Sequence, residues 1–226
     1  MKLIERMTGK KIIKIDSNVP RSYLVSLVIK YSLNLLRFIT VKFLFRSHSK
    51  RAYIGRKTRI ICKSKIDLGN NVRIGDNTKI NAISEEGLVL GENVKIGDNS
   101  IVLLSGGISN IGKGMTIGKN SFFSEYTFFG AAGGIKIGEN VIGGQYVRFH
   151  AENHSFNSHD KLIREQGVTH KGICIGNDCW IGSGVVFLDG AELGNGCVVG
   201  ANSIVTKKFP NNSIIVGSPA KIIKKR

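Results

Sequence analysis

Every sixth residue of the C-terminal part of the chain is apolar. From residue 175 onward, the residues at this interval are Ile175, Ile181, Phe187, Leu193, Val199 and Val205. Glycine follows at four of these six steps, and a small or medium-sized residue comes three positions after that. Helices repeat every 3.6 residues and flat strands every two, so neither explains the pattern. A chain with this period must turn a corner after each short segment.

The same hexad recurs upstream. Its pairs of aliphatic residue and glycine are Leu68-Gly69, Ile74-Gly75, Leu90-Gly91, Ile96-Gly97, Ile111-Gly112, Ile117-Gly118 and Ile137-Gly138. A triangular solenoid has this period, because each hexad supplies one strand and one corner and three hexads close a coil. We predict an all-β solenoid over residues 51–226, with about seven or eight coils, strands about 4.8 Å apart and residues about 18 positions apart stacked.

Composition agrees with many tight corners. The chain has 28 glycines and 3 prolines, and we expect the glycines to provide the special backbone dihedrals of the corners. Cys179 and Cys197 occupy the small apolar position of the repeat, which predicts packing roles. No cysteine pair has metal-ligand spacing and no signal peptide opens the chain, as expected for reduced thiols in a cytoplasmic protein.

Residues 1–50 precede the repeats and predict a basic amphipathic helical segment. Polar residues follow helical spacing at Ser22, Ser26, Lys30, Asn34 and Arg37. Charged residues interrupt the apolar stretch 22–46, so no uncharged run reaches the roughly 20 residues that cross a bilayer. Two interpretations stay open: the helix covers the open end of the solenoid, or it lies on an anionic membrane.

The period breaks between residues 150 and 172. About twenty non-repeating residues cannot fit inside a coil, so they predict a protruding loop, and long loops in compact repeats are usually functional. Four of the five histidines of the chain lie in it, at His150, His154, His159 and His170.

The formal net charge is +17. Such a charge favours anionic partners, including phosphorylated small molecules and acidic membranes. No nucleic-acid recognition motif accompanies it, so we do not expect nucleic-acid binding.

Three short segments carry a resemblance to a known family. They are Asn153-His154 in the loop, Trp180-Ile181-Gly182 after it, and Gly217-Ser218-Pro219-Ala220-Lys221 near the end. Together with the hexads, residues 51–226 resemble the hexapeptide-repeat acyltransferases, and among these the sugar O-acetyltransferase branch that includes maltose, galactoside and xenobiotic acetyltransferases. The resemblance implies a left-handed parallel β-helix, a loop 150–172 at the active site, a tail 207–226 and a homotrimer with sites between neighbouring solenoids.

The resemblance implies acetyl transfer from acetyl-CoA to a sugar hydroxyl, with His154 as general base and no metal. A sugar hydroxyl is too weak an acid to attack a thioester unaided, and an imidazole can accept its proton. Asn153 is expected at the substrate, and either Glu152 or Asp160 could orient the imidazole ring.

The same resemblance predicts the residues that contact coenzyme A. They are Trp180, Gly182, Ser183, Gly200, Ala201, Lys207, Lys208 and Lys221. Ser183 and the Gly200-Ala201 amides are expected beside the thioester and pantetheine, and the lysines near the phosphates. Related sugar acetyltransferases place a substrate-binding Asn on an earlier coil, where this chain reads Ser124-Glu125-Tyr126. The identity of the acceptor therefore stays open.

Three other functions fit part of the sequence. A zinc carbonic anhydrase uses the same solenoid, and His154 and His159 have a matching spacing, but no third ligand lies at a suitable distance upstream. A membrane-associated scaffold would explain the charge and leave the Asn-His pair unexplained. An amino-sugar N-acetyltransferase could use the same base.

The basic helix favours an enzyme at the inner face of the cell membrane that acts on a surface polysaccharide or its precursor, such as capsule, O-antigen or lipopolysaccharide.

Overall fold

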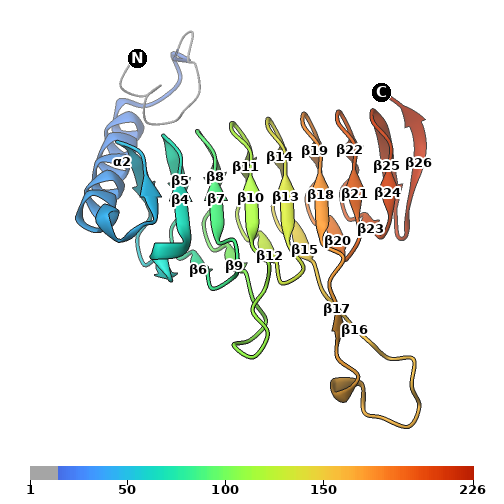
Figure 1. Ribbon diagram of the computed structural model, residues 1–226. Coiled ribbons are helices and arrows are strands. Elements are labelled where there is room, and N and C mark those ends of the chain that lie inside the picture. The colour runs from blue at the N-terminus through green and yellow to red at the C-terminus, as the bar shows by residue number, and fades with distance from the viewer. Residues whose placement is uncertain (1–14) are drawn as a thin grey trace.

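The protein is a three-sided parallel β-helix, described by a computed structural model over residues 15–226. Residues 1–14, part of the predicted N-terminal segment, lie outside the described residues. Successive strands join three sheets in rotation, and the strands within each sheet pair in parallel except at the C-terminal end (Figure 1). The predicted solenoid is confirmed.

We name the three sheets A, B and C. Sheet A contains β1 (Ser47–His48), β4 (Ile66–Leu68), β7 (Leu88–Leu90), β10 (Met115–Ile117), β13 (Ile135–Ile137), β18 (Ile173–Ile175), β21 (Glu192–Leu193) and β24 (Lys208–Phe209). Sheet B contains β2 (Ala52–Ile54), β5 (Val72–Ile74), β8 (Lys95–Ile96), β11 (Phe122–Phe123), β14 (Ile142–Gly143), β19 (Trp180–Ile181), β22 (Val198–Val199), β25 (Ser213–Gly217) and the antiparallel β26 (Ala220–Lys225). Sheet C contains β3 (Arg59–Ile61), β6 (Lys79–Asn81), β9 (Ile101–Leu103), β12 (Phe128–Gly130), β15 (Arg148–His150), β20 (Val186–Leu188) and β23 (Ile204–Val205).

The predicted stacking of residues 18 apart holds only near the C-terminus. There Cys174 pairs with Glu192. In the earlier coils the partners are farther apart in sequence, as in Ile66 with Leu88 and Leu88 with Met115. In the last coil they are closer, as in Glu192 with Lys208. The passages from sheet A to B and from B to C keep the six-residue step, so the extra residues all enter at the corner between sheets C and A. That corner holds the short 3-10 helix η2 (Lys63–Lys65), a loop at residues 104–114 and the loop 150–172.

The hexad pattern predicts the interior closely. All six apolar residues from Ile175 to Val205 are at most 3% exposed. The rings of Phe129, Phe149 and Phe187 stack on successive coils with centroids 5.1 and 4.8 Å apart. Cys179 and Cys197 are buried as predicted, and burial raises the pKa of the Cys179 thiol to about 11. The pair Ile111-Gly112 is the exception, because Ile111 lies in the loop 104–114 and is 37% exposed.

The glycines of the repeat act differently from the expectation. Their φ angles are ordinary, and what they allow is close approach between coils: a Cβ built on Gly97 would lie 2.4 Å from the carbonyl carbon of Ser124 on the next coil. The left-handed corner conformation is instead taken two residues later, mostly by Asn, which tolerates it well. The side chains of Asn71, Asn93 and Asn120 hydrogen-bond in a ladder along one such corner.

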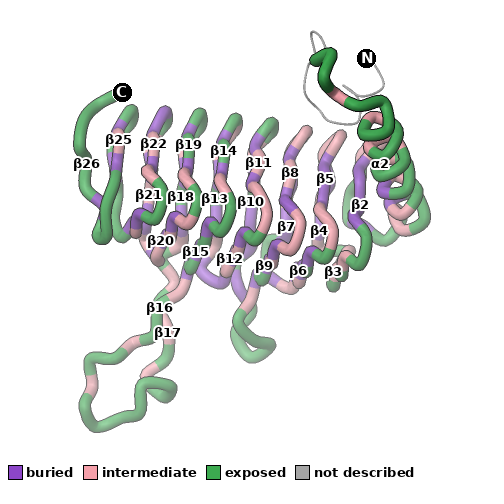
Figure 2. Tube along the Cα trace, turned by 180° about the vertical axis from the view of Figure 1, so that it is seen from behind, coloured by how far each residue is buried: buried purple, intermediate pink, exposed green. Residues whose placement is uncertain are grey.

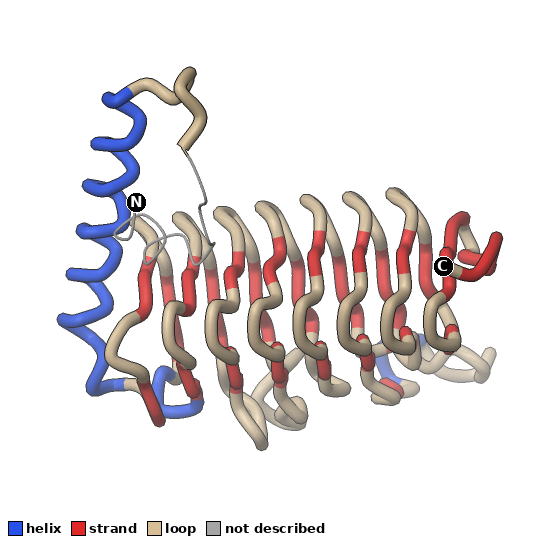
Figure 3. The backbone as a smooth tube through the Cα atoms, turned by 90° about the horizontal axis from the view of Figure 1, so that it is seen from above, coloured by secondary structure: helices blue, strands red, loops and turns tan. Residues whose placement is uncertain are grey.

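Helix α2 (Arg21–Val41) lies across the N-terminal end of the solenoid and packs on β2 (Figures 1 and 3). It continues into the 3-10 helix η1 (Lys42–Leu44), and Phe38 of α2 is completely buried against the solenoid. By length and composition alone, Arg21–Leu44 is long and apolar enough to cross a membrane, although only 11% of its most apolar window is buried in the protein. The opposite end of the solenoid carries the β25–β26 hairpin.

A methyl group at a repeat glycine is expected to disrupt coil stacking. Gly97→Ala forces two backbones apart, and we expect a loss of about 3 kcal/mol or more, equivalent to a fall in Tm of roughly 10 °C for a chain of this size. Gly107→Ala is the control, because a Cβ there meets no atom within 4 Å. Thermal unfolding by circular dichroism measures both variants, and equal Tm values would contradict the close-approach role.

Candidate active site

The loop 150–172 leaves and re-enters the solenoid through a fixed neck. His170 Nε2 lies 2.7 Å from Glu152 Oε2 across it. On the returning strand, the backbone N–H groups of Lys171 and Gly172 donate to the buried carboxylate of Asp189, at 2.9 and 2.8 Å. We call these five residues the loop neck. They hold both ends of the loop against the coil.

Beyond the neck, the chain forms a hairpin that projects from the body (Figures 1 and 2). Strand β16 (Asn153–His154) pairs antiparallel with β17 (Val168–Thr169). The outer part includes the 3-10 helix η3 (Ile163–Glu165) and is bonded internally, since the Gln166 amide donates to the carbonyls of Ser158 and Lys161. The projecting loop therefore has a defined shape.

The imidazole of His154 is exposed on β16, beside Asn153. The structure of residues 15–226 shows no hydrogen bond from this ring to either carboxylate predicted to orient it. Glu152 is paired with His170, and Asp160 lies farther out, where its backbone N–H donates to Ser158 Oγ at 3.3 Å. The His154 ring is thus exposed, and the Glu152 carboxylate is engaged at the loop neck.

His150 lies at the base of the loop and packs on Phe128, with ring centroids 5.1 Å apart. Desolvation of the ring and the nearby Arg148 guanidinium lower the pKa of His150. Ser105, Gly106, His150 and Glu152 line a small cavity of about 180 Å³, so the two loops at this corner meet here.

A second hollow lies on the corner between sheets B and C. Its volume is about 440 Å³, and its lining residues are Tyr126, Phe128, Tyr146, Arg148, Ser183, Gly184, Ala201 and Asn202. We call it the corner groove. Ser183 and Ala201, which were predicted beside the thioester, both lie in it, and Ser183 Oγ donates to Gln145 Oε1 at 3.0 Å. No residue of the β16–β17 hairpin lines the groove within the same chain.

Two tyrosines in the corner groove adopt an unusual backbone conformation. The same corner position on successive coils is occupied by Lys57, Asn77, Asn99, Tyr126, Tyr146, Gly184 and Asn202, all with φ between 54° and 72°. Asn and Gly suit this left-handed region, whereas a bulky aromatic residue there is strained by about 1–3 kcal/mol. Tyr126 and Tyr146 nevertheless sit there with their rings stacked at 4.9 Å and about half exposed. Strain retained beside a groove indicates a functional role.

The other residues predicted to bind coenzyme A lie on several faces. A Cβ on Gly182 would lie 2.6 Å from the Ala201 nitrogen, so these two coils approach closely beside the groove. Trp180 is 58% exposed on sheet B, and a Cβ on Gly200 would meet Val216.

The three predicted lysines are not brought together. Lys221 is on β26 of sheet B, whereas Lys207 and Lys208 are at β24 of sheet A. Lys208 pairs with Glu192 at 2.8 Å, and Lys207 lies over the Phe209 ring.

Sequence reasoning missed several residues of the site. Tyr126, Tyr146 and Arg148 were not predicted, although the two tyrosines follow Glu125 and Gln145 at equivalent points of successive coils. That recurrence could have been noticed once the corner position was known. Asp189 could not be recognised from the sequence, because its hydrogen bonds to the Lys171 and Gly172 amides depend on where the loop returns to the solenoid. Among residues 15–226, no three His, Cys, Asp or Glu side chains gather as a metal site would require.

Comparison with known families agrees with the fold. The family described as "Hexapeptide repeat of succinyl-transferase" matches residues 66–104, and "Bacterial transferase hexapeptide (six repeats)" matches residues 175–207. The chain is a hexapeptide-repeat protein. Its fold is the left-handed β-helix of this group of acyltransferases, as predicted.

Relatives of this hexapeptide-repeat protein carry acetyltransferase names. It is 31% identical to the probable acetyltransferase Rv3034c of Mycobacterium tuberculosis over 72% of this chain and 45% of that protein. Among solved structures, AntD, an N-acyltransferase from Bacillus cereus in complex with dTDP and 3-hydroxybutyryl-CoA, has a TM-score of 0.56 at 19% identity, covering 84% of this chain and 88% of that chain. The hexapeptide-repeat acetyltransferase VCA0836 from Vibrio cholerae has a TM-score of 0.50 at 22% identity, covering 91% and 88%. The two structures show the fold, and the chain spans about half the length of the curated relatives it matches.

The pair between Glu152 and His170 is expected to hold the loop in place. Glu152→Gln removes the carboxylate, so the neck should open more often and expose the loop to trypsin at Lys161 and Arg164. We expect cleavage several-fold faster than in the wild type. Glu165→Gln, an exposed change on the loop itself, is the control. Equal cleavage rates for wild type and Glu152→Gln would show that the neck does not depend on this pair.

Proposed function

We propose that this protein is an acetyltransferase that moves acetyl from acetyl-CoA to a sugar hydroxyl, with His154 as general base. The observation that carries the proposal is an exposed imidazole, next to Asn153, on a shaped loop held by a bonded neck. The acetyltransferase names of the relatives and the hexapeptide repeats support the same class of reaction.

The proposed chemistry is direct transfer. His154 accepts the proton of the sugar hydroxyl as the oxygen attacks the thioester carbonyl carbon. The carbon–sulfur bond then breaks, and the thiolate of coenzyme A leaves and takes up the proton from the imidazolium. Because the ring lies in water and has no carboxylate partner within the described chain, the acceptor hydroxyl can reach either of its nitrogens.

We propose that a complete site needs two chains, as in the expected homotrimer. The hairpin projects away from the solenoid, and none of its residues reaches the corner groove of its own chain. A neighbouring solenoid would bring its groove to the hairpin. Ser183 and the Gly182 and Gly200-Ala201 backbone would then contact the thioester and pantetheine, with Trp180 packing beside them.

The proposed partners of the coenzyme A phosphates are lysines in the C-terminal part of the chain. Lys208 is partly neutralised by Glu192, whereas Lys207 and Lys221 are in no ion pair that the structure shows among residues 15–226. Lys207 and Lys221 are therefore the stronger partners for an anion.

The stacked rings of Tyr126 and Tyr146 support a sugar acceptor. An exposed aromatic face packs well against the apolar face of a sugar ring, and Arg148 beside it can meet an anionic substituent. We propose a surface polysaccharide or its precursor as the acceptor. An amino sugar is the alternative, since an amine could use the same base, and the products of an acceptor panel distinguish the two.

Replacement of His154 tests the base directly. We expect His154→Ala to lower turnover by a factor of about 100 or more, with acetyl-CoA binding retained. Thiol release from acetyl-CoA, measured with a panel of sugars, nucleotide sugars and amino sugars, provides the readout. His159→Ala, on the same loop, is the control. Unchanged turnover in His154→Ala would remove the proposed mechanism, and no binding of acetyl-CoA by the wild type would favour a non-catalytic scaffold.

Replacement of Tyr146 tests the corner groove. Asn is favourable in the left-handed conformation, so Tyr146→Asn should keep Tm within a few degrees of the wild type while the strain is relieved and the stacking is lost. We expect KM for the acceptor to rise about tenfold and KM for acetyl-CoA to change little. A large fall in Tm with unchanged KM would instead assign the tyrosines to stability.

A further inference from the structure

The outward face of α2 is apolar, and nothing in the described chain covers it. Val25, Ile29, Leu33 and Leu36 follow helical spacing, and their exposed fractions lie between 47% and 58%. Phe43 and Leu44 extend the surface at the end of the helix, at 78% and 57%. We call these six residues the outward face. Lys42 is next to this surface, with its ammonium 4.8 Å from the centre of the Phe43 ring.

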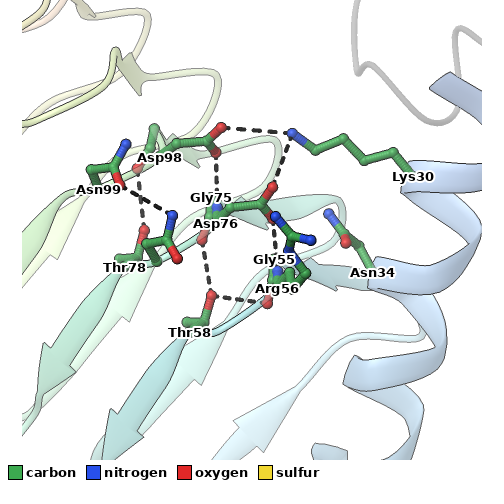
Figure 4. A network of polar contacts seen from close by, with 12 residues as sticks. Lys30, Asn34, Gly55, Arg56, Thr58, Gly75, Asp76, Thr78, Asp98 and Asn99 are labelled. Carbon is green, nitrogen blue, oxygen red and sulfur yellow. Dashed lines mark hydrogen bonds and ion pairs between the residues drawn. The ribbon is translucent and has the colours of Figure 1, made fainter. Parts of the chain in front are cut away.

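Two polar residues of α2, Lys30 and Asn34, face the solenoid. The Lys30 ammonium lies 3.5 Å from the Asp76 carboxylate and 3.6 Å from that of Asp98 (Figure 4). Burial alone would lower the pKa of Lys30, but the two carboxylates outweigh it and raise the pKa. Asn34 is buried, with only 6% of its surface exposed, and its side-chain oxygen accepts a hydrogen bond from Arg37 at 2.6 Å.

This arrangement differs from that of an ordinary surface helix, because apolar residues lie on both sides of α2. A surface helix normally buries its apolar face and turns its charged face to water. Here the side of α2 that faces the solenoid includes Lys30 and Asn34 beside the apolar Leu35 and Phe38, while the aliphatic side chains of the outward face remain exposed. A contiguous exposed apolar surface of this kind marks an interaction site.

The charge around the outward face identifies the partner. Residues 17–66, which include α2 and the first coil, contain 12 lysines and arginines and no acidic residue. Residues 67–226 contain 16 basic and 14 acidic residues, so the charge of the chain is concentrated at the helix end. On the first coil, Lys50, Arg56, Lys57 and Arg59 are exposed. An exposed apolar surface at the same end of the molecule as these cations suits a bilayer with anionic headgroups.

We propose that the outward face of α2 docks this protein on an anionic lipid bilayer, with the helix lying in the plane of the interface. A spanning orientation would pull the helix off the solenoid, expose Phe38 and break the contacts of Lys30 with Asp76 and Asp98. A second copy of the chain on this face would place two sets of uncompensated cations together, which is repulsive. The proposal does not depend on the transferase chemistry.

Docking in this way sets the orientation of the molecule. Because α2 lies across the end of the solenoid, the coils stack away from the membrane (Figure 3). The loop 150–172 then projects sideways, parallel to the bilayer (Figure 1).

Vesicle flotation with the full chain tests the proposal. We expect the wild type to bind phosphatidylglycerol-containing vesicles at least tenfold more strongly than pure phosphatidylcholine vesicles at about 0.1 M salt, with weaker binding at higher salt. Ile29→Glu/Leu33→Glu should lower binding to the anionic vesicles at least tenfold. Ile222→Glu/Ile223→Glu is the matched control, since it adds the same charge on exposed aliphatic residues at the opposite end.

Three results would overturn the proposal. They are equal binding to both vesicle types, undiminished binding by the Ile29→Glu/Leu33→Glu variant, and a change of oligomeric state in that variant by light scattering, which would assign the face to a second copy. The comparison of vesicle types uses only the wild type, so it stands even where a variant does not fold. Thiol release without an added membrane reports on the transferase proposal separately.

Discussion

Parallel backbone pairing between coils is the interaction on which the whole structure depends. Each coil donates and accepts hydrogen bonds along three sheets, so the spacing between coils is fixed at about 4.8 Å. That spacing leaves no room for a Cβ at the repeat glycines, as at Gly97 against Ser124. It also stacks side chains of equal position, which produces the aromatic column of Phe129, Phe149 and Phe187. The sequence repeat is a direct result of this geometry.

The constraint acts unequally on the three corners. Two corners keep the six-residue step in every coil between residues 66 and 205, whereas the corner between sheets C and A takes up every insertion there. The loop 150–172 therefore stands on the most permissive edge, and Glu152, His170 and Asp189 hold it in a fixed position. The corner between sheets B and C shows the opposite case, since its length is invariant and only the residue type varies. There, Tyr126 and Tyr146 replace the Asn that the backbone favours.

The fold could be predicted from the sequence because its cause is local. An apolar residue such as Ile181 and a small one such as Cys179 have the same surroundings in every coil, so spacing alone reports their burial. Coil length could not be read in the same way, because the residues added at one corner have no period. The Asn-His pair at Asn153 and His154 was recognisable through the family likeness. The contacts of the loop neck were not, since they join Glu152 to His170 and Lys171 to Asp189 across chain segments whose relative position depends on the fold.

The number of coils also sets the distance between the N-terminal helix and the loop 150–172. In sheet A, β4, β7, β10 and β13 lie between β1, next to α2, and β18, where the loop 150–172 returns. Five coil spacings separate the helix from the loop, a height of about 25 Å. Such a stack resists bending, because every coil is bonded to its neighbours on three sides. A chain with one coil more or fewer in this stretch would carry the same loop about 5 Å farther from, or nearer to, whatever surface its end helix rests on.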